Sequence, residues 1–414
     1  MTDPTPVRVA AIHQDPNRFW RLWTGNAFSN LGDGLYQFAL PLIALDITRS
    51  PSLVSGVTLM LTLAWPVFGL HAGSVVDRFD RRTILLVVSL GRIATLGLLT
   101  VAITSGGLTL PMLYATALVL GIGETLADTA LTALVPATVD HDRLDWANGR
   151  ITAGQTVTNT FLGPPLAGAL LGFSAGLVTA VATSLYGLAA GILATLSGTR
   201  SPTTATSAPA RPGWGVTEGF RFLWQNQTIR RLTLFTAAMN VWWAAWTALF
   251  VLFAVAPGPL GLTPTAYGAL LVAMAVGGIA GSLWAERIAQ LVGTKNALTL
   301  DLVGTALLVG VPAWTTHPWL VAGANVAAGA GAAIWVVLVS SIRQRLTPDP
   351  LLGRLYSASR LISWGVLPVG AALGGLAAEF LGVQAVFAIG GLASLGLLAA
   401  FAVFVTEDDL RRPG

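Results

Sequence analysis

Apolar runs of about 20 residues, the length that a helix needs to cross the hydrocarbon of a bilayer, recur along the whole chain. The runs are continuous and lack the alternation of barrel strands, so they predict helices. Twelve spans fit the sequence, with expected limits at residues 19–45, 52–76, 83–104, 109–134, 147–172, 175–197, 230–256, 263–288, 295–315, 318–344, 354–380 and 383–405.

The composition agrees with a multi-pass membrane protein. Hydrophobic residues make up 54% of the 414 residues and charged residues 10%, where a soluble domain carries about a quarter charged residues. There is no cysteine, which excludes disulfides and thiolate sites. Residues 1–18 are polar and lack the apolar core of a cleavable signal, so the first span is expected to direct insertion.

Basic residues predict the orientation. With Met1 inside, the inward segments carry twenty arginines and lysines and the outward segments only Arg49, while Arg92 and Arg360 lie within spans. The positive-inside rule therefore predicts that both termini lie on the cytoplasmic side of a plasma (inner) membrane. This asymmetry accounts for the formal charge of +4 without a nucleic-acid partner.

One long connection divides the chain into two groups of six spans. A weak repeat supports the division, because Gly163 and Gly168 lie 207 residues before Gly370 and Gly375. The sequence predicts an all-α membrane protein of two pseudo-symmetric six-helix bundles with a cavity between them. Its expected parts are a tail 1–18, a bundle 19–197, a linker 198–229, a bundle 230–405 and a tail 406–414.

The linker contains an amphipathic segment. From Val216 to Trp224 the apolar side chains share one helical face. We expect an interfacial helix on the inner leaflet, and the alternative is a helical connector packed on protein.

The turn between spans two and three concentrates charge in ten residues, 73–82, which we call the charged turn. Such a segment must lie in water or among headgroups, and its density of charge suggests a device that holds two packed parts together. Its notable residues are Gly73, Asp77, Arg78, Asp80, Arg81 and Arg82.

The charged turn resembles the signature G-x-x-x-D-R-x-G-R-R of the major facilitator superfamily, with Asp80 in the place of a glycine. Within that superfamily the chain is similar to the branch of the enterobactin exporter and the macrolide efflux pumps. The similarity is carried by Phe19-Trp-Arg-Leu-Trp23, Ser29-Asn-Leu-Gly-Asp33, Ala39-Leu-Pro-Leu42, Gly219-Phe-Arg-Phe-Leu-Trp224 and Leu352-Gly-Arg354. It implies the major facilitator fold.

The segment Gly163-Pro164-Pro-Leu-Ala-Gly168 is similar to the superfamily's antiporter motif. It departs from that motif at Ala167 and Asn159, and Ala117 stands where many drug–proton antiporters carry an arginine.

The resemblance also implies a gate at the charged turn. Asp77 is expected to cap the start of span eleven near Leu355, across the two halves, and Asp128 to pair with Arg81. The alternative for Asp77 is an ordinary charged inner turn.

Span one carries a polar stripe that should not face lipid. Asn26, Asn30, Asp33 and Gln37 are spaced four, three and four residues apart, so they share one helical face. A carboxylate facing lipid at mid-membrane would cost at least ~2.5 kcal/mol. We expect a cavity wall with a proton- or substrate-linked carboxylate, and the alternative is a stripe that packs helices together.

Span four carries Glu124 and Asp128 one turn apart. Two close carboxylates repel each other when both are ionised, which favours proton uptake by one of them. Arg92 has no partner nearby in the sequence and is expected to pair with Glu124 or Asp33. Glu124 is the favoured coupling residue and Asp128 the favoured structural latch.

Other polar and aromatic residues within spans are weaker candidates. Trp242 and Trp246 share a face of span seven and could form an aromatic cavity wall, with packing or lipid contact as the alternative. Arg360 and Asp301 are expected to be structural. Further cavity candidates are Gln155 and Asn159 in span five and Asn240 in span seven.

These features together predict a secondary transporter that works by alternating access, with proton-coupled efflux of a small drug-, siderophore- or natural-product-like molecule. The alternatives are an uncoupled or importing facilitator and a non-transporting receptor. The chain lacks a phosphate-binding G-x-x-x-x-G-K-[ST] loop, and its four histidines have no ligand spacing, so we expect no enzyme, metal or cofactor. Expected partners are the substrate, protons and lipid, and a monomer suffices.

Overall fold

The computed structural model describes residues 17–140, 143–196 and 214–411. Most of the expected tail 1–18, the first part of the linker and residues 412–414 lie outside these ranges. The N-terminal half contains α1 (Arg18–Ile47), α2 (Pro51–Arg78), α3 (Arg81–Thr104), α4 (Leu110–Leu134), the 3-10 turn η1 (Val135–Ala137), α5 (Leu144–Gln155), the π-helical η3 (Thr156–Leu162), α6 (Gly163–Leu171) and α7 (Ala175–Ala194). After α8 (Trp214–Gln225), the C-terminal half contains α9 (Gln227–Ala254), α10 (Pro264–Val292), α11 (Thr294–Trp314), α12 (Pro318–Leu346), α13 (Asp349–Gly365), α14 (Leu367–Leu381), α15 (Val383–Phe404) and the short α16 (Glu407–Arg411).

Ten helical segments in the described ranges are long and apolar enough to cross a membrane. The two expected spans that do not meet this criterion have identifiable causes. The first, α1, carries the polar stripe around Asp33, and the fifth is divided by η3. Pro164 and Pro165 have no N–H to give to the carbonyls one turn earlier, which favours an irregular turn at that point.

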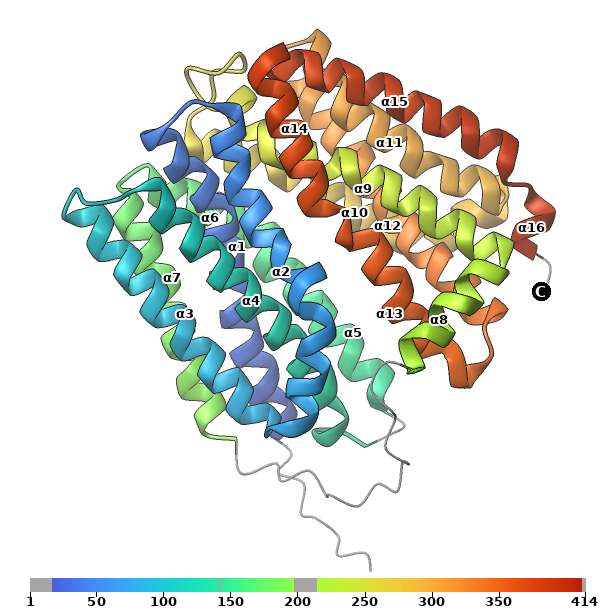
Figure 1. Ribbon diagram of the computed structural model, residues 1–414, viewed down its shortest axis with the longest axis horizontal. Helices are drawn as coiled ribbons and strands as arrows, with labels where there is room; N and C mark the ends of the chain where they lie inside the picture. The colour runs from blue at the N-terminus through green and yellow to red at the C-terminus, as the bar shows by residue number, and fades with distance from the viewer. Residues whose placement is uncertain (1–16, 141–142, 197–213, 412–414) are drawn as a thin grey trace, which may run out of the picture.

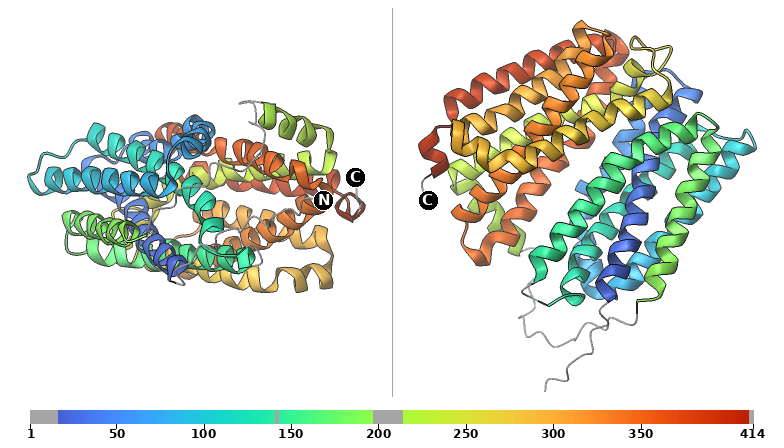
Figure 2. Two further views of the ribbon diagram at one scale, coloured as in Figure 1. Left: turned by 90° about the horizontal axis from the view of Figure 1, so that it is seen from below. Right: turned by 180° about the vertical axis from the view of Figure 1, so that it is seen from behind.

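The helices form two bundles (Figures 1 and 2), and each half has six spans within the described residues when α5–η3–α6 and α13–α14 count as one each. The bundles meet at one end of the molecule and diverge toward the other (Figure 1). We call the diverging end, where α2 ends and α3 begins, the charged-turn end. At the opposite end α6 packs on α10 and α14 packs on α2.

The predicted repeat is confirmed by this packing. A methyl group placed on Gly168 would lie 2.5 Å from the carbonyl oxygen of Pro264 in α10, the second span of the other half. A methyl group on Gly375 would lie 1.7 Å from Ser55 Oγ in α2, again the second span of the other half. Glycine at both positions lets the two halves approach at backbone distance, and the two contacts are related by the pseudo-twofold.

Asp80, which replaces a glycine of the superfamily signature, has a local function. Its carboxylate accepts hydrogen bonds from Thr83 N at 3.1 Å and Thr83 Oγ1 at 3.0 Å, so it caps the N-terminus of α3. The charged turn is thus a sharp break between two helices that run in opposite directions.

Helix α8 packs on protein, which was the alternative expectation for this segment. Leu223 is fully buried against Leu355 and Ala358 of α13, and Glu218 forms an ion pair with Arg354. Trp224 on the same helix is 55% exposed.

Candidate functional site

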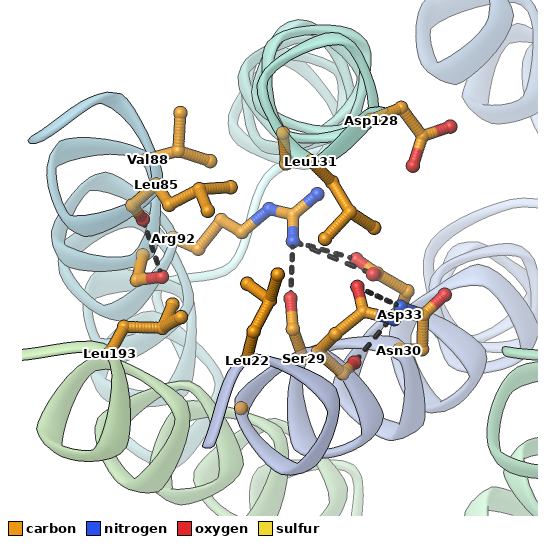
Figure 3. A pocket seen from close by; sticks show the side chains of 14 residues that line it. Leu22, Ser29, Asn30, Asp33, Leu85, Val88, Arg92, Asp128, Leu131 and Leu193 are labelled. Carbon is orange, nitrogen blue, oxygen red and sulfur yellow. Dashed lines mark hydrogen bonds and ion pairs between the residues drawn. The ribbon is translucent and has the colours of Figure 1, made fainter. Parts of the chain in front are cut away.

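A carboxylate, a guanidinium and a phenol meet inside the N-terminal half. Arg92 of α3 reaches Asp33 of α1 with an Nη1–Oδ1 distance of 3.1 Å, and it also donates to Ser29 Oγ at 3.1 Å (Figure 3). Tyr186 of α7 donates to Asp33 Oδ1 at 2.6 Å, and its ring lies 5.0 Å from the guanidinium carbon. The side chains of Arg92 and Asp33 are 2% and 7% exposed, so their charges balance each other in an apolar interior.

Two nitrogen atoms of Arg92, Nε and Nη2, donate no hydrogen bond to the described residues. Arg92 lines a cavity of about 20 Å³, about the volume that one water needs. Asn30 and Asp128 also line this space, so it connects the buried pair with the second carboxylate of α4 (Figure 3).

Glu124 lies on the other side of this polar stripe. Its carboxylate accepts hydrogen bonds from the Tyr36 hydroxyl at 3.2 Å and from Gln37 Nε2 at 3.3 Å. Within the described residues no cation lies within ion-pair distance of Glu124. Of the two predicted partners for Arg92, the structure therefore selects Asp33 and leaves Glu124 bound to neutral donors.

Glu124 faces a cavity of about 380 Å³ between the two halves, which we call the central cavity. Glu124 is the only carboxylate in its described lining, and the rest is apolar, aromatic, hydroxyl and amide. The lining residues are Gly34, Gln37, Phe38, Pro41, Thr58, Leu61, Thr62, Trp65, Glu124, Asn159, Thr160, Pro164, Trp243, Trp246, Thr247, Tyr267, Leu271, Met274, Trp364 and Leu367.

Of the predicted cavity residues, Asn30, Asp33 and Arg92 line the small space beside the buried pair instead, and three others line neither space. Trp242 packs toward α15, where a methyl group on Gly390 would lie 2.7 Å from its ring, and its neighbour Trp243 faces the cavity instead. Asn240 donates to the carbonyl oxygen of Ser363 at 2.6 Å, across α9 and α13. Gln155, the last residue of α5, is outside the described lining, whereas Asn159 in η3 is part of it.

The antiporter-like motif lies where the halves meet. Gly163 contacts α1, where a methyl group would lie 2.7 Å from the Gly34 Cα, and Pro164 lines the central cavity. Gly168 contacts α10, as described above. The motif therefore fixes one wall of the cavity by close backbone packing.

A second cavity, of about 500 Å³, continues toward the charged-turn end, and we call it the vestibule. Trp65 and Trp364 line both cavities. Between them lies Arg360 of α13, with its guanidinium carbon 4.1 Å from the Trp65 ring centroid and 4.8 Å from that of Trp364. Its Nη2 is 4.0 Å from Asp128 Oδ2. Arg360 therefore connects the two halves, although the sequence predicted only a structural role near the inner end.

The expected gate contacts are absent in this conformation. Asp128 faces Arg360, and Arg81 instead donates to the carbonyl oxygen of Ala133 at 2.9 Å, near the end of α4. Arg82 donates to the carbonyl oxygen of Leu193 at 3.1 Å, near the end of α7. Both arginines thus satisfy carbonyls at helix C-termini.

The two remaining charges of the turn lie at the surface. Asp77 and Arg78 are exposed, and Asp77 makes no described contact with Leu355. Gly73 lines the vestibule. The predicted cap across the halves is not formed here, because the halves diverge at this end.

The opposite end is held by a small polar clamp. Glu379 Oε2 of α14 accepts hydrogen bonds from Ser50 Oγ at 2.6 Å, Ser52 N at 3.1 Å and Ser52 Oγ at 2.9 Å, all at the start of α2. Glu379→Ala should therefore loosen this end. The test introduces a cysteine at Thr247, in the central cavity, with and without Glu379→Ala. With Glu379→Ala the cysteine is expected to react several-fold faster with an impermeant thiol reagent applied from that end. Equal reaction rates with and without the substitution would contradict the clamp.

The comparisons with known proteins agree with this architecture. Residues 10–410 match the family described as transmembrane secretion effector. An MFS-type transporter of Mycobacterium tuberculosis is 30% identical over 161 residues, which cover 38% of this chain and only 36% of that relative. The multidrug efflux pump Tap of Mycolicibacterium fortuitum is 24% identical over 92% of this chain and 94% of its own length. The macrolide efflux protein A of Streptococcus pyogenes is 23% identical over 90% and 92%.

Solved structures share the fold at low identity. A mutant of the nucleoside transporter NupG has a TM-score of 0.74 at 14% identity, covering 94% of this chain and all of that one. A bacterial homologue of the iron transporter ferroportin, in an inward-facing state, has a TM-score of 0.69 at 17% identity, covering 94% of this chain and 99% of that one.

The family and these relatives are transporters rather than enzymes, as predicted. The chain belongs to the transmembrane secretion effector family and is a multi-pass transporter of the major facilitator superfamily.

Proposed function

We propose that the chain lies in a cell membrane and exports a small amphipathic organic molecule in exchange for protons, by alternating access. The charged-turn end would face the cytoplasm. The distribution of basic residues supports this orientation. The names of the efflux relatives support the direction. With the halves packed at the opposite end and separated by the vestibule, the conformation would be inward-facing.

The observation that carries the proposal is the place of Glu124. Glu124 is the only carboxylate in the described lining of a cavity that both halves build, and its hydrogen-bond donors among the described residues, Tyr36 and Gln37, are neutral. A carboxylate in such a place meets water from whichever side the cavity opens to, so it can load a proton on one side and release it on the other.

The buried pair has a different role in this scheme. Asp33 and Arg92 neutralise each other, and Tyr186 fixes the carboxylate. The pair holds α1, α3 and α7 together as one rigid half. The two carboxylates of α4, Glu124 and Asp128, lie beside it, and their surroundings change when the halves rock. Proton release from Glu124 in the inward-facing state and proton uptake in the outward-facing state would couple transport to the gradient.

The cavity walls indicate the class of substrate. Aromatic rings such as those of Phe38, Trp243 and Tyr267 line it together with hydroxyls such as that of Thr62. Ligand pockets of about 300–1,000 Å³ with mostly apolar walls and a few polar groups suit drug-sized molecules. A compact amphipathic molecule with an aromatic or polycyclic body fits this lining.

Flux in sealed proteoliposomes tests the proposal against its alternatives. Accumulation of a substrate found in a resistance screen should follow an imposed pH gradient and disappear when the gradient is collapsed. Flux that is indifferent to the gradient would favour an uncoupled facilitator. Binding without counterflow would favour a receptor.

Asp77→Asn provides a separate test of the charged turn. Asp77 is exposed here, so the substitution should leave the folded protein intact while impairing the state in which the Asp77 end of α2 meets the start of α13 near Leu355. We expect several-fold slower transport with an unchanged melting temperature. Asp408→Asn, another carboxylate near the charged-turn end, serves as the control. Transport at the parental rate would exclude the cross-half cap.

A further inference from the structure

A third cavity, of about 370 Å³, lies wholly in the C-terminal half between α9, α12 and α13. Arg343 and Arg360 line it, and its described lining contains no carboxylate. It adjoins the vestibule along Arg360 and Trp364, which line both. We call it the arginine pocket.

Arg343 carries a charge that has no counter-ion among the described residues. Its Nη2 donates to Thr233 Oγ1 at 3.2 Å, its Nε has no partner, and it forms no ion pair among the described residues. Arg360 has one carboxylate, Asp128, at 4.0 Å on the vestibule side. Arg343 lies in the last turn of α12 and is partly buried, and a partly buried guanidinium is costly unless an anion or several acceptors balance it. The pocket therefore holds an excess of positive charge.

Two serine hydroxyls in the same pocket also lack partners. Ser359 and Ser363 are 1% and 4% exposed, and neither Oγ has a hydrogen-bond partner among the described residues. Buried hydroxyls are nearly always hydrogen-bonded, and both of these belong to residues that line the pocket, so they are available to a ligand bound there. The indole rings of Trp335 and Trp364 complete the walls. Donors and apolar surfaces converge on one space.

We propose that the arginine pocket binds an amphipathic organic anion, with its carboxylate or phosphate between Arg343 and Arg360 and its apolar body against Trp335 and Trp364. A guanidinium recognises either anion by paired hydrogen bonds. The anion has two sources, a soluble molecule that enters through the vestibule or the headgroup of an acidic phospholipid. This site is distinct from the central cavity, and its occupancy does not depend on proton coupling.

Binding of 1-naphthoate to the purified protein in detergent, measured by calorimetry, tests the site. Arg343→Gln should weaken binding at least tenfold. The matched control is Arg345→Gln, which removes the same charge from an exposed position two residues along α12 and should leave the affinity unchanged. Ser359→Ala, a milder change inside the pocket, should weaken binding several-fold and covers the case in which Arg343→Gln fails to fold. No binding by the parent, or equal binding by the pocket variants and Arg345→Gln, would overturn the proposal.

Nanodiscs separate the two sources. If phosphatidylglycerol weakens naphthoate binding relative to phosphatidylcholine, and does so only with Arg343 present, the site takes a lipid headgroup. If the two lipids give the same affinity, it takes a soluble anion. Glu124→Gln should leave the naphthoate affinity unchanged, so failure of proton coupling and failure of this site are told apart.

Discussion

Glu124→Gln is expected to reduce gradient-driven flux to the level of protein-free liposomes while substrate exchange continues within a few-fold of the parental rate. Glutamine keeps the size of the side chain and can still accept hydrogen bonds from Tyr36 and Gln37. It cannot exchange a proton. The cavity would still bind and release substrate, but a pH gradient would have no group to act on.

The two assays use the same proteoliposomes and differ only in the imposed gradient. Glu286→Gln is the matched control, because Glu286 is exposed and lies outside the central cavity. Its gradient-driven flux should equal that of the parent. Normal coupling in Glu124→Gln would transfer the role to Asp33 or Asp128, whereas loss of exchange as well would indicate a substrate-binding role for Glu124.

Arg92→Met is expected to destabilise the protein more than any exchange at the surface. It leaves the Asp33 carboxylate buried without its cation, and breaking a buried pair in this way typically costs about 3–5 kcal/mol. The double variant Asp33→Asn with Arg92→Met removes both charges and should recover most of that loss. Equilibrium or thermal unfolding in detergent gives the order of stabilities.

The pair of Arg231 and Asp409 supplies the comparison. Its two side chains are 27% and 33% exposed, so Arg231→Met should cost at most about 1 kcal/mol. If Arg92→Met were no more destabilising than Arg231→Met, or if the double variant were worse than the single one, the Asp33–Arg92 pair would not hold the N-terminal half together.

The fold was predictable because it follows from length and periodicity. Apolar runs define spans, basic residues and one long connection divide them, and the glycines at 163, 168, 370 and 375 mark close helix contacts that leave no room for a larger residue. The interruption at η3 was missed because a π-helical turn has no clear sequence pattern beyond the prolines that follow it.

The site was predictable only in part. A polar stripe indicates that Asp33 and Glu124 avoid lipid, but it does not tell which partner Arg92 chooses. The third member of the buried group, Tyr186, is a single tyrosine in an apolar span with no motif around it, and it donates to Asp33. Trp242 and Trp243 are adjacent in sequence, and small differences in helix rotation decide which one faces the cavity.

Arg360 was visible in the sequence as a charge within a span. Its contacts with Trp65 and Asp128 come from the other half of the chain, nearly 300 and more than 200 residues away. Local sequence carries no information on such contacts. The same holds for the arginine pocket, which joins Arg343 and Arg360 from separate helices.

Two spin-label distances test most directly whether the halves rock about the central cavity. The chain has no cysteine, so labels can be placed freely. One pair, at Thr132 and Ser357, spans the vestibule, and the other, at Leu53 and Leu381, spans α2 and α14 at the opposite end. When the pH is lowered or substrate is added, the Thr132–Ser357 distance should shorten in the same population of molecules in which the Leu53–Leu381 distance lengthens. Distances that stay fixed, or that change in the same direction, would contradict alternating access.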